Sequence, residues 1–310
     1  EYVEIEERNQ MRKQGLIKYG CGKCELIRIG AMDDIDLVVG HHSSTEKKYL
    51  VANRSCNGFI TKSVRFEGKS AHAAGAPEDG IDAMAAANIA MHAIDAQRES
   101  FRDCDTVRVH GCLTKCSNAA NIIADDVKME YSIRGKTISS YLDASKKVDR
   151  SLKAGAMAMG CKVTIETMPG NLPIIPVKDA TVVREVLELV CEDTPVTETG
   201  PDFHSTSSGD YGDISCIMPL LQFNTGGFSG ELHNNNVEVC DPYDAYVNTA
   251  KIFALTAYRL LKDHAQRANS IIDEFEPTLS KKEYIDLMDS MLTTEVYQGE
   301  ALIADSPKKQ

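Results

Sequence analysis

The sequence has no tryptophan, few other aromatic residues and no excess of positive charge. Of its 310 residues, 46 are acidic and 34 are basic, which gives a formal net charge of -12 at pH 7. Nucleic-acid binding needs a face rich in lysine and arginine to neutralise phosphates, and no basic stripe runs along this chain. We therefore expect no nucleic acid among its partners.

The chain also lacks a long apolar run. No stretch approaches the roughly 20 apolar residues that a membrane helix needs, and we find no positively charged, apolar leader. With no such leader, the ten cysteines of a chain this large are expected to stay reduced. Cys21 and Cys24 alone have metal or redox spacing, which is a weak signal without a second pair. We predict a soluble, cytoplasmic protein that does not bind membranes.

What the sequence contains instead is a regular succession of strand and helix patterns from about residue 58 onward. Period-two alternation predicts strands, and longer runs with helical spacing predict helices. The expected order is strand 58–67, helix 78–100, strands 105–113 and 126–134, helix 138–159 and strand 162–168. This β-α-β-β-α-β order is that of a ferredoxin-like domain, whose free sheet edge or helix face offers a surface for dimerisation.

The segments on either side of this module predict a second domain of the α/β class. Ile35 to Val39 predicts a buried strand that leads into His41 and His42, and a proline-marked linker at 169–176 is followed by helix, strand and helix patterns. We therefore predict a discontinuous α/β catalytic domain interrupted by a ferredoxin-like lid. The expected pieces are 1–57 (truncated at its start) and 171–262 for the catalytic domain, 58–170 for the lid, and 263–310 for a C-terminal helical extension.

Histidines stand at three junctions of predicted elements, where side chains are held rigidly and still reach a ligand. His72 follows the strand at 58–67 and precedes an alanine-rich helix that Pro77 introduces. Adjacent residues of an extended segment point to opposite faces, so at most one of His41 and His42 should face a crevice at the strand end. His233 lies in a polar loop between a strand and a helix, where it is either a surface histidine or a ligand. Side chains that could bind metal gather in the outer pieces, namely Glu6, Glu7, His42, Asp210 and His233, and they suit zinc or manganese.

Several linked motifs in the same order resemble one known family. The segments are GKCELIRIGAMDDIDLVVGHH, FEGKSAHAAGAPEDGIDAM, VRVHGCLTKCSNAANIIADDVKMEYSIRG and SSGDYGDISCIMP followed by GELH. They are similar to segments of the aminoacylase, carboxypeptidase G and amidohydrolase group of co-catalytic metallopeptidases, peptidase family M20, and closest to its amidohydrolase branch. The resemblance covers about residues 21 to 262.

The resemblance implies a role for particular residues. His42 and His233 would bind metal, and Glu7 would be a further ligand beside Glu6 as general base. His72 would reach the active site of a partner subunit and donate a hydrogen bond to the oxyanion, with Asn121 supporting the same subsite. Arg134 would hold the free carboxylate of the substrate with its guanidinium fork. Gly227 and Gly230 would let the loop backbone approach the substrate.

The sequence departs from the family pattern in three places. Fourteen residues separate Glu7 from Gly22 where the family has a short link, so Glu6 and Glu7 are either the catalytic pair before an insertion or a charged helix end. Ala124 stands where the lid motif has proline. The first metal-binding motif of the family is expected upstream of residue 1.

These observations predict a homodimeric, metal-dependent amidohydrolase with two zinc ions, or manganese as the alternative. Its substrate would be an N-acyl amino acid, an aminobenzoyl-amino acid or a dipeptide with a free carboxylate. The alternative is a catalytically incomplete homologue that acts as a dimeric binding or assembly protein. A third hypothesis is a regulatory module whose lid binds an amino acid through Arg134. It ranks last, because it gives no role to His42 and His233.

Overall fold

The computed structural model describes residues 5–46, 48–117, 119–191 and 194–299, and the chain forms two compact units. Unit 1 comprises Glu1–Cys21, Gly58–Asn171 and Ile285–Gln310, and unit 2 comprises Gly22–Asn57 and Leu172–Tyr284. The chain passes from one unit to the other near residues 58 and 171. Of the described residues, 5–21 and 285–299 also belong to the unit that contains the lid.

Unit 1 is built on an antiparallel five-stranded sheet with the ferredoxin-like order that the sequence predicts. Its central elements follow one another as β4 (Gly58–Glu67), α3 (Ala83–Ala96), β5 (Arg108–Lys115), β6 (Asp126–Gly135), α4 (Ile138–Met159) and β7 (Lys162–Pro169). The strand order across the sheet is β13-β7-β4-β6-β5. The fold class predicted from the sequence is therefore confirmed.

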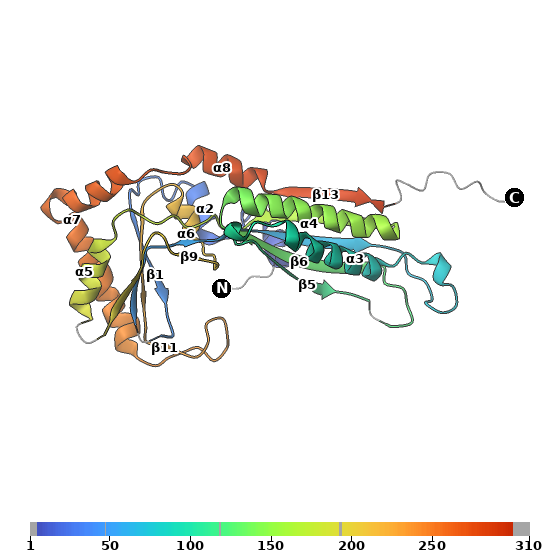
Figure 1. The fold of residues 1–310 in the computed structure, drawn as a ribbon, viewed down its shortest axis with the longest axis horizontal. Helices are drawn as coiled ribbons and strands as arrows, with labels where there is room; N and C mark the ends of the chain where they lie inside the picture. The colour runs from blue at the N-terminus through green and yellow to red at the C-terminus, as the bar shows by residue number, and fades with distance from the viewer. Residues whose placement is uncertain (1–4, 47, 118, 192–193, 300–310) are drawn as a thin grey trace. The chain divides into compact units, whose positions relative to one another are not determined.

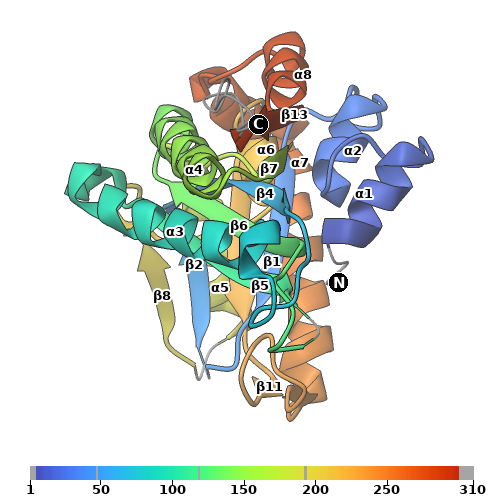
Figure 2. The ribbon, with the colours of Figure 1, turned by 90° about the vertical axis from the view of Figure 1, so that its right-hand side faces the viewer.

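The two long helices of unit 1 lie side by side over one face of this sheet (Figure 2). Alternate side chains of β4 and β6, such as Phe66 and Val127, point into that layer and are fully buried. The other face of the sheet carries the polar residues of the same strands, which is the usual alternation of a sheet covered on one side. Residues that act on a ligand from the strands of unit 1 therefore belong to the polar face.

Helix α3 is shorter than the helix predicted at 78–100. The side chain of Asp82 accepts hydrogen bonds from the backbone N–H groups of Met84 and Ala85, so Asp82 is the N-cap. The residues before it form a short 3-10 turn, Pro77–Asp79, and a second one, Gln97–Ser100, follows the helix. The proline signal was therefore real, but it marks a turn that precedes the helix.

The C-terminal segment contains a strand where the sequence predicted only helix. Helix α8 (Lys281–Ser290) leads into β13 (Thr293–Gln298), which pairs antiparallel with β7 and closes that edge of the sheet. Helix α1 (Ile5–Lys13) also belongs to unit 1, and the Asn9 side-chain amide donates a hydrogen bond to Glu166 of β7. In the described residues of unit 1, β5 is the strand at the remaining open edge.

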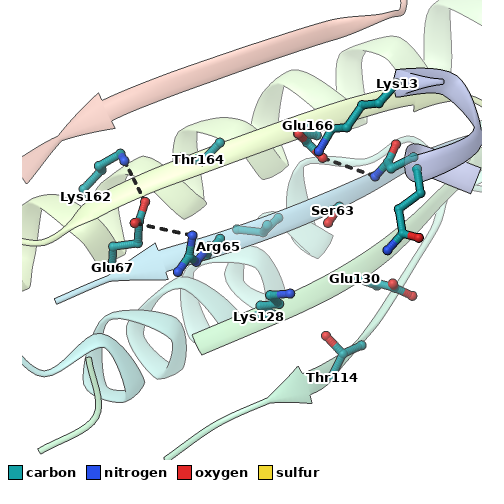
Figure 3. Close-up of a pocket in the computed structure, with 13 residues that line it drawn as sticks. Lys13, Ser63, Arg65, Glu67, Thr114, Lys128, Glu130, Lys162, Thr164 and Glu166 are labelled. Atoms are coloured by element: carbon teal, nitrogen blue, oxygen red, sulfur yellow. Dashed lines mark hydrogen bonds and ion pairs between the residues drawn. The ribbon is translucent and has the colours of Figure 1, made fainter. Parts of the chain in front are cut away.

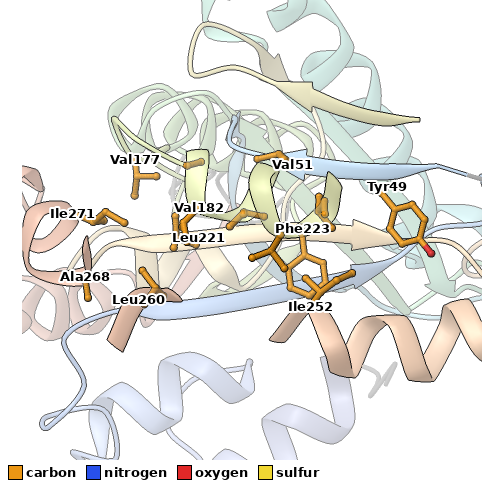
Figure 4. Close-up of a cluster of buried hydrophobic side chains, with 14 of the residues drawn as sticks. Tyr49, Val51, Val177, Val182, Leu221, Phe223, Ile252, Leu260, Ala268 and Ile271 are labelled. Atoms are coloured by element: carbon orange, nitrogen blue, oxygen red, sulfur yellow. The ribbon is translucent and has the colours of Figure 1, made fainter. Parts of the chain in front are cut away.

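Unit 2 is a mixed α/β unit around a four-stranded sheet with the order β1-β10-β2-β8. The strands are β1 (Val38–Ser43), β2 (Tyr49–Ala52), β8 (Val196–Thr199) and β10 (Leu220–Thr225), and β1 runs parallel to β10. Helices α5 (Thr181–Val190) and α7 (Thr249–Glu274) pack on the sheet through one apolar cluster (Figure 4). Val51, Leu221 and Phe223 of the strands have no exposed surface there.

Shorter elements complete unit 2. They are α2 (Gly22–Arg28), α6 (Tyr211–Ser215), the paired strands β3 (Ser55–Cys56) and β9 (His204–Ser205), the paired strands β11 (Phe228–Ser229) and β12 (Glu238–Val239), and a π-helical turn, Tyr243–Asn248. Helix α7 is interrupted at Lys262–Ala265, where three successive residues have left-handed backbone angles (Figure 1). None of the described helices is both long and apolar enough to cross a membrane.

One buried ion pair joins the two layers of unit 1. Lys62 of β4 is fully buried, and its ammonium lies 2.7 Å from a carboxylate oxygen of Asp149 on α4. The Lys62 ammonium also donates a hydrogen bond to the Thr167 hydroxyl of β7 at 2.9 Å. Burial lowers the pKa of Lys62 and raises that of Asp149, and the mutual attraction opposes both shifts.

We expect Asp149→Asn to lower the free energy of unfolding by about 3 kcal/mol, because it leaves the buried Lys62 ammonium without its counter-charge. Urea denaturation followed by circular dichroism measures this, since the chain has no tryptophan. The matched control is Asp95→Asn in the exposed pair with Arg98, which should cost less than about 1 kcal/mol. Equal losses in the two variants would contradict the assignment of Lys62 and Asp149 as an interior pair.

Candidate functional site

The His72 side chain is fixed by the turn in which it stands. Its ring nitrogen Nδ1 accepts hydrogen bonds from the backbone N–H groups of Ala74 and Gly75, at 3.2 and 2.9 Å. An imidazole whose Nδ1 accepts must, when neutral, carry its proton on Nε2. The exposed His72 ring therefore presents Nε2–H as a donor to solvent or a ligand.

The segment that contains Asn121 lies directly beside this turn. His72 and Ile122 form an antiparallel bridge, and the backbone N–H of Ala73 donates to the Asn121 carbonyl at 3.0 Å. The next residue of the same segment, Ile123, donates its N–H to the Ala71 carbonyl at 2.9 Å. The structure thus brings together the two lid residues that the sequence assigned to one subsite.

Arg134 lies at the opposite end of the lid sheet. His72 and Asn121 adjoin the end at which Glu67 of β4 pairs with Asp126 of β6, whereas Arg134 pairs with Phe59 near the start of β4. A strand rises about 3.3 Å per residue, so Arg134 is about 26 Å from Asp126 along β6. A dipeptide spans about 7 Å when extended. No single dipeptide-sized ligand can therefore touch His72 and Arg134 of the same lid.

The two adjacent histidines of β1 point to different environments, as expected for an extended segment. His41 is half-buried between the rings of Phe223 and Phe253, and its Nε2 lies 2.7 Å from the Thr225 hydroxyl. His42 is exposed, and its Nδ1 lies 2.7 Å from the carbonyl oxygen of Ser43. Since a carbonyl only accepts, Nδ1 carries the proton and Nε2 keeps its lone pair, an arrangement typical of metal-binding histidines.

His233 stands in an exposed loop of unit 2 with two glycines nearby. His233 itself has a left-handed backbone angle, φ 69°. Gly227 and Gly230 flank β11 at φ 93° and 87°, and a Cβ atom would come within 2.5 Å of Ala245 N at Gly227 and within 2.3 Å of Asn236 O at Gly230. The fold of the loop itself therefore requires glycine at both positions, whatever their role toward a substrate.

The acidic pair is placed differently from the other predicted ligands. Glu6 and Glu7 lie in α1, a helix of unit 1, whereas His42 and His233 belong to unit 2. Glu7 is exposed, and the side chain of Glu6 lies outside the described part of the chain. Asp210, another acidic residue noted from the sequence, forms an ion pair with Lys23 at 2.7 Å.

These placements bear on the metal centre that the family resemblance implies. Within the described residues, no group of three or more histidine, cysteine, aspartate or glutamate side chains is arranged to hold a metal ion. The contact of His42 Nδ1 with the Ser43 carbonyl leaves Nε2 with a free lone pair, but the described residues by themselves do not fit a metal centre. The roles of Glu6, Glu7, His42 and His233 as base and ligands stay predictions.

The polar face of the lid sheet carries rows of charged side chains that pair across the strands. A polar hollow of about 390 Å³ on this face is bordered by α1 (Figure 3). Arg65 of β4 and Lys115 of β5 both bind Asp126, at 2.7 and 2.5 Å, and Lys162 binds Glu67 at 2.7 Å. The hydrogen bond from Arg65, with a smaller contribution from Lys115, lowers the pKa of Asp126 to about 2.

The sequence analysis assigned no role to two residues of this face, Arg108 and Phe59. Arg108 of β5 lies directly opposite Arg134, and the ring of Phe59 lies 5.7 Å from the Arg134 guanidinium carbon. The period-two pattern of the strands contained the signal, because it puts Phe59, Arg108 and Arg134 on the polar face once the register is known. The register itself was not readable from the sequence.

The comparisons with known proteins agree with this architecture. Residues 55–157 match the family described as peptidase dimerisation domain. The human Xaa-Arg dipeptidase is 25% identical over 282 residues, covering 87% of this chain and 62% of the relative. The mouse Xaa-Arg dipeptidase is 28% identical over 207 residues, covering 64% of this chain and 46% of the relative. The chain therefore spans less than two thirds of the length of these curated relatives.

Solved structures share the fold at low sequence identity. An aminobenzoyl-glutamate utilization protein from Klebsiella pneumoniae superposes with a TM-score of 0.57 at 17% identity, covering 76% of this chain and 56% of that one. A dinuclear metal binding peptidase of the M20 family from Bacillus subtilis superposes with a TM-score of 0.52 at 14% identity, covering 78% and 62%. The chain thus shares the α/β fold of these structures. The match over residues 55–157 identifies the lid as a peptidase dimerisation domain, and the chain is similar to Xaa-Arg dipeptidases and, in fold, to M20 peptidases.

The Asp126 cluster predicts a defined loss of stability in acid. The carboxyl has an ordinary pKa near 3.9 when unfolded and about 2 when folded, so its stabilising effect is complete above about pH 4 and is lost as the pH falls toward 2. The difference in unfolding free energy between the wild type and Asp126→Asn should be constant from pH 7 to 5 and shrink below pH 4. Urea denaturation over this range measures it, with the exposed neighbour Asp125→Asn as control. A difference that does not change with pH would contradict the pairing.

Proposed function

We propose that this protein is a metal-dependent amidohydrolase or dipeptidase. Its substrate would be an N-acyl amino acid, an aminobenzoyl-amino acid or a dipeptide with a free carboxylate. The curated relatives are named Xaa-Arg dipeptidases, and one structural neighbour is named for the utilization of aminobenzoyl-glutamate. The structural observation that carries the proposal is the His72 turn, which holds an exposed N–H donor against the segment of Asn121.

In this proposal, different lid residues bind the amide and the carboxylate of the substrate. His72 Nε2–H would donate to the oxygen that becomes negative when the amide carbonyl is attacked, with Asn121 beside it. The Arg134 guanidinium would bind the substrate carboxylate through two parallel hydrogen bonds. Gly227 and Gly230 would contribute backbone at the substrate, and Glu6 would act as the general base.

The proposal includes a divalent metal, two zinc ions or manganese as the alternative. The support is a structural neighbour described as a dinuclear metal binding peptidase. Such ions polarise a carbonyl and activate water when they are bound. His42, His233 and Glu7 would be this chain's contributions to the ligand set.

The distance between His72 and Arg134 within one lid supports a homodimer as the active species. His72 and Arg134 lie more than about 26 Å apart along the sheet, so a substrate that touches both must receive them from two lids. In unit 1, β13 covers one edge of the sheet, whereas every residue of β5 except the half-buried Val109 is exposed at the other. The β5 edge is therefore the proposed contact with the second copy. We place this dimer in the cytoplasm, on the composition alone.

One observation favours a second function. Because the described residues do not assemble a metal centre, a dimeric binding or assembly protein without catalysis remains the alternative. Elemental analysis and an amide hydrolysis assay of the full-length protein separate the two. Bound divalent metal together with turnover supports the amidohydrolase, and the absence of both supports the alternative.

We expect His72→Ala to lower kcat by about 100-fold or more, because one donor to the developing oxyanion is lost. Bound metal should be unchanged, since His72 is not proposed as a ligand. The control is His264→Asn, which replaces an exposed histidine of unit 2 and keeps a residue type that tolerates left-handed backbone angles. Loss of metal in the His72 variant, or unchanged turnover, would refute the assigned role.

Charged substitutions on the open edge should separate the dimer. Cys112→Lys with Leu113→Glu puts charges on exposed positions of β5, which opposes edge-to-edge pairing. Sedimentation velocity should then give the monomer mass. Val296→Lys makes a comparable change on β13, at the opposite edge, and should leave the dimer intact. If the dimer instead forms through β13, Val296→Lys should give the monomer mass and the β5 variant should remain a dimer.

A further inference from the structure

Two arginines face each other across neighbouring strands at one end of the lid sheet. Arg108 of β5 and Arg134 of β6 are register partners, so their side chains leave the sheet on the same face. Partners of this kind have their Cβ atoms about 5 Å apart. Arg134 lies over the Phe59 ring of β4, which limits the directions open to its guanidinium.

This pair differs from the other cations of the polar face. Arg65, Lys115 and Lys162 each bind a carboxylate on that face. In the described residues, by contrast, no ion pair is formed by Arg108 or Arg134. The Arg108 guanidinium donates instead to the carbonyl oxygen of Val107 at 3.0 Å.

The cavity beside Arg108 does not provide a carboxylate that pairs with its guanidinium. A hollow of about 400 Å³ beside Arg108 is also lined by Asp95 and Asp103. Asp95 pairs with Arg98, and within the described residues neither carboxylate forms an ion pair with Arg108. Like charges directly opposite on a sheet destabilise it, so the arginine pair is an electrostatic cost for the folded protein alone.

We propose that Arg108 and Arg134 together bind a substrate that carries two carboxylates, which makes Arg108 a residue that determines specificity. This inference rests on the proposed function, in which Arg134 holds the α-carboxylate. Arg108 would then hold a second carboxylate on the side chain of the same residue. Each guanidinium offers a planar fork that matches one carboxylate.

The chemical class that fits is an N-acyl or peptidyl derivative of aspartate or glutamate. A dianion neutralises both guanidinium groups, whereas a single carboxylate leaves one of them facing a neutral side chain. A C-terminal arginine would bring a third positive charge to the pair. The arrangement therefore favours an acidic C-terminal residue and disfavours the arginine after which the curated relatives are named.

Binding of three matched probes tests this without requiring turnover. Isothermal titration of the chain with N-acetylglutamate, N-acetylglutamine and N-acetylarginine compares a dianion, its neutral isostere and a cationic side chain. N-acetylglutamate should bind at least about tenfold more tightly than N-acetylglutamine, since a charged hydrogen-bonded contact is worth about that factor. N-acetylarginine should bind most weakly.

Two variants assign the preference to Arg108. Arg108→Gln should bind N-acetylglutamate and N-acetylglutamine equally. Arg65→Gln removes a paired arginine of the same face and should keep the wild-type preference. Equal binding of the two probes by the wild type, no binding of any probe, or a preference that survives in Arg108→Gln would overturn the inference.

A ligand-free measurement checks the electrostatic argument separately. The thermal midpoint of Arg108→Gln should equal or exceed that of the wild type, because like-charge repulsion is removed. Arg65→Gln should have a lower midpoint, because it breaks the pair with Asp126. A clear loss of stability in Arg108→Gln would mean that Arg108 has a structural counter-charge, and it would refute the site. The proposed hydrolysis is tested separately, by metal content and amide hydrolysis. If the protein hydrolyses amides but shows no preference for dianions, only the role of Arg108 is refuted.

Discussion

The lid depends on a close contact between its two helices. Gly155 of α4 faces α3 so closely that a Cβ atom there would come within 2.3 Å of the Ala86 carbonyl oxygen. On the α3 side, Ala86, Ala87 and Ala90 have no exposed surface. Small residues on both helices let the backbones approach, and the pair then covers one face of the sheet as a single layer.

That contact also determines where the proposed oxyanion donor stands. The first residue of α3, Ala83, donates its backbone N–H to the carbonyl of Ala124, and Asp82 caps the helix. Because α3 is fixed against α4, the segment before it and the segment around Asn121 are held together at the same end of the sheet. His72 is thus positioned by helix packing as well as by its own turn. Arg134 lies at the far end of the sheet, where it pairs with Phe59.

Most of the lid was predictable because its strands alternate strictly and its helices are long. The predicted strands at 58–67 and 126–134 agree with β4 and β6 to within one residue. Strand β13 was not predicted, because Thr293 to Gln298 is a short, exposed edge strand whose only support is its pairing with β7. The start of α3 was misplaced, because Pro77 is a strong signal and the cap at Asp82 is a weaker one.

The site was harder to predict than the fold. His72, Asn121 and Arg134 were proposed as site residues by resemblance to a family, and the structure adds which of them are neighbours. The pair of Arg108 and Arg134 depends on strand register, which a sequence without its partners does not reveal. The association of residues 5–21 with the lid likewise depends on long-range contacts such as that between Asn9 and Glu166.

The central claim is that one active site draws His72 and Arg134 from two different lids. Co-expression of a His72→Ala chain with an Arg134→Gln chain tests it directly, with the rate of amide hydrolysis as the measurement. Each variant alone should be nearly inactive. In a two-fold dimer, half of the mixed population pairs one chain of each kind and has one intact site, so the mixture should recover roughly a quarter of the wild-type rate. Activity in the mixture no higher than in either variant alone would contradict the claim.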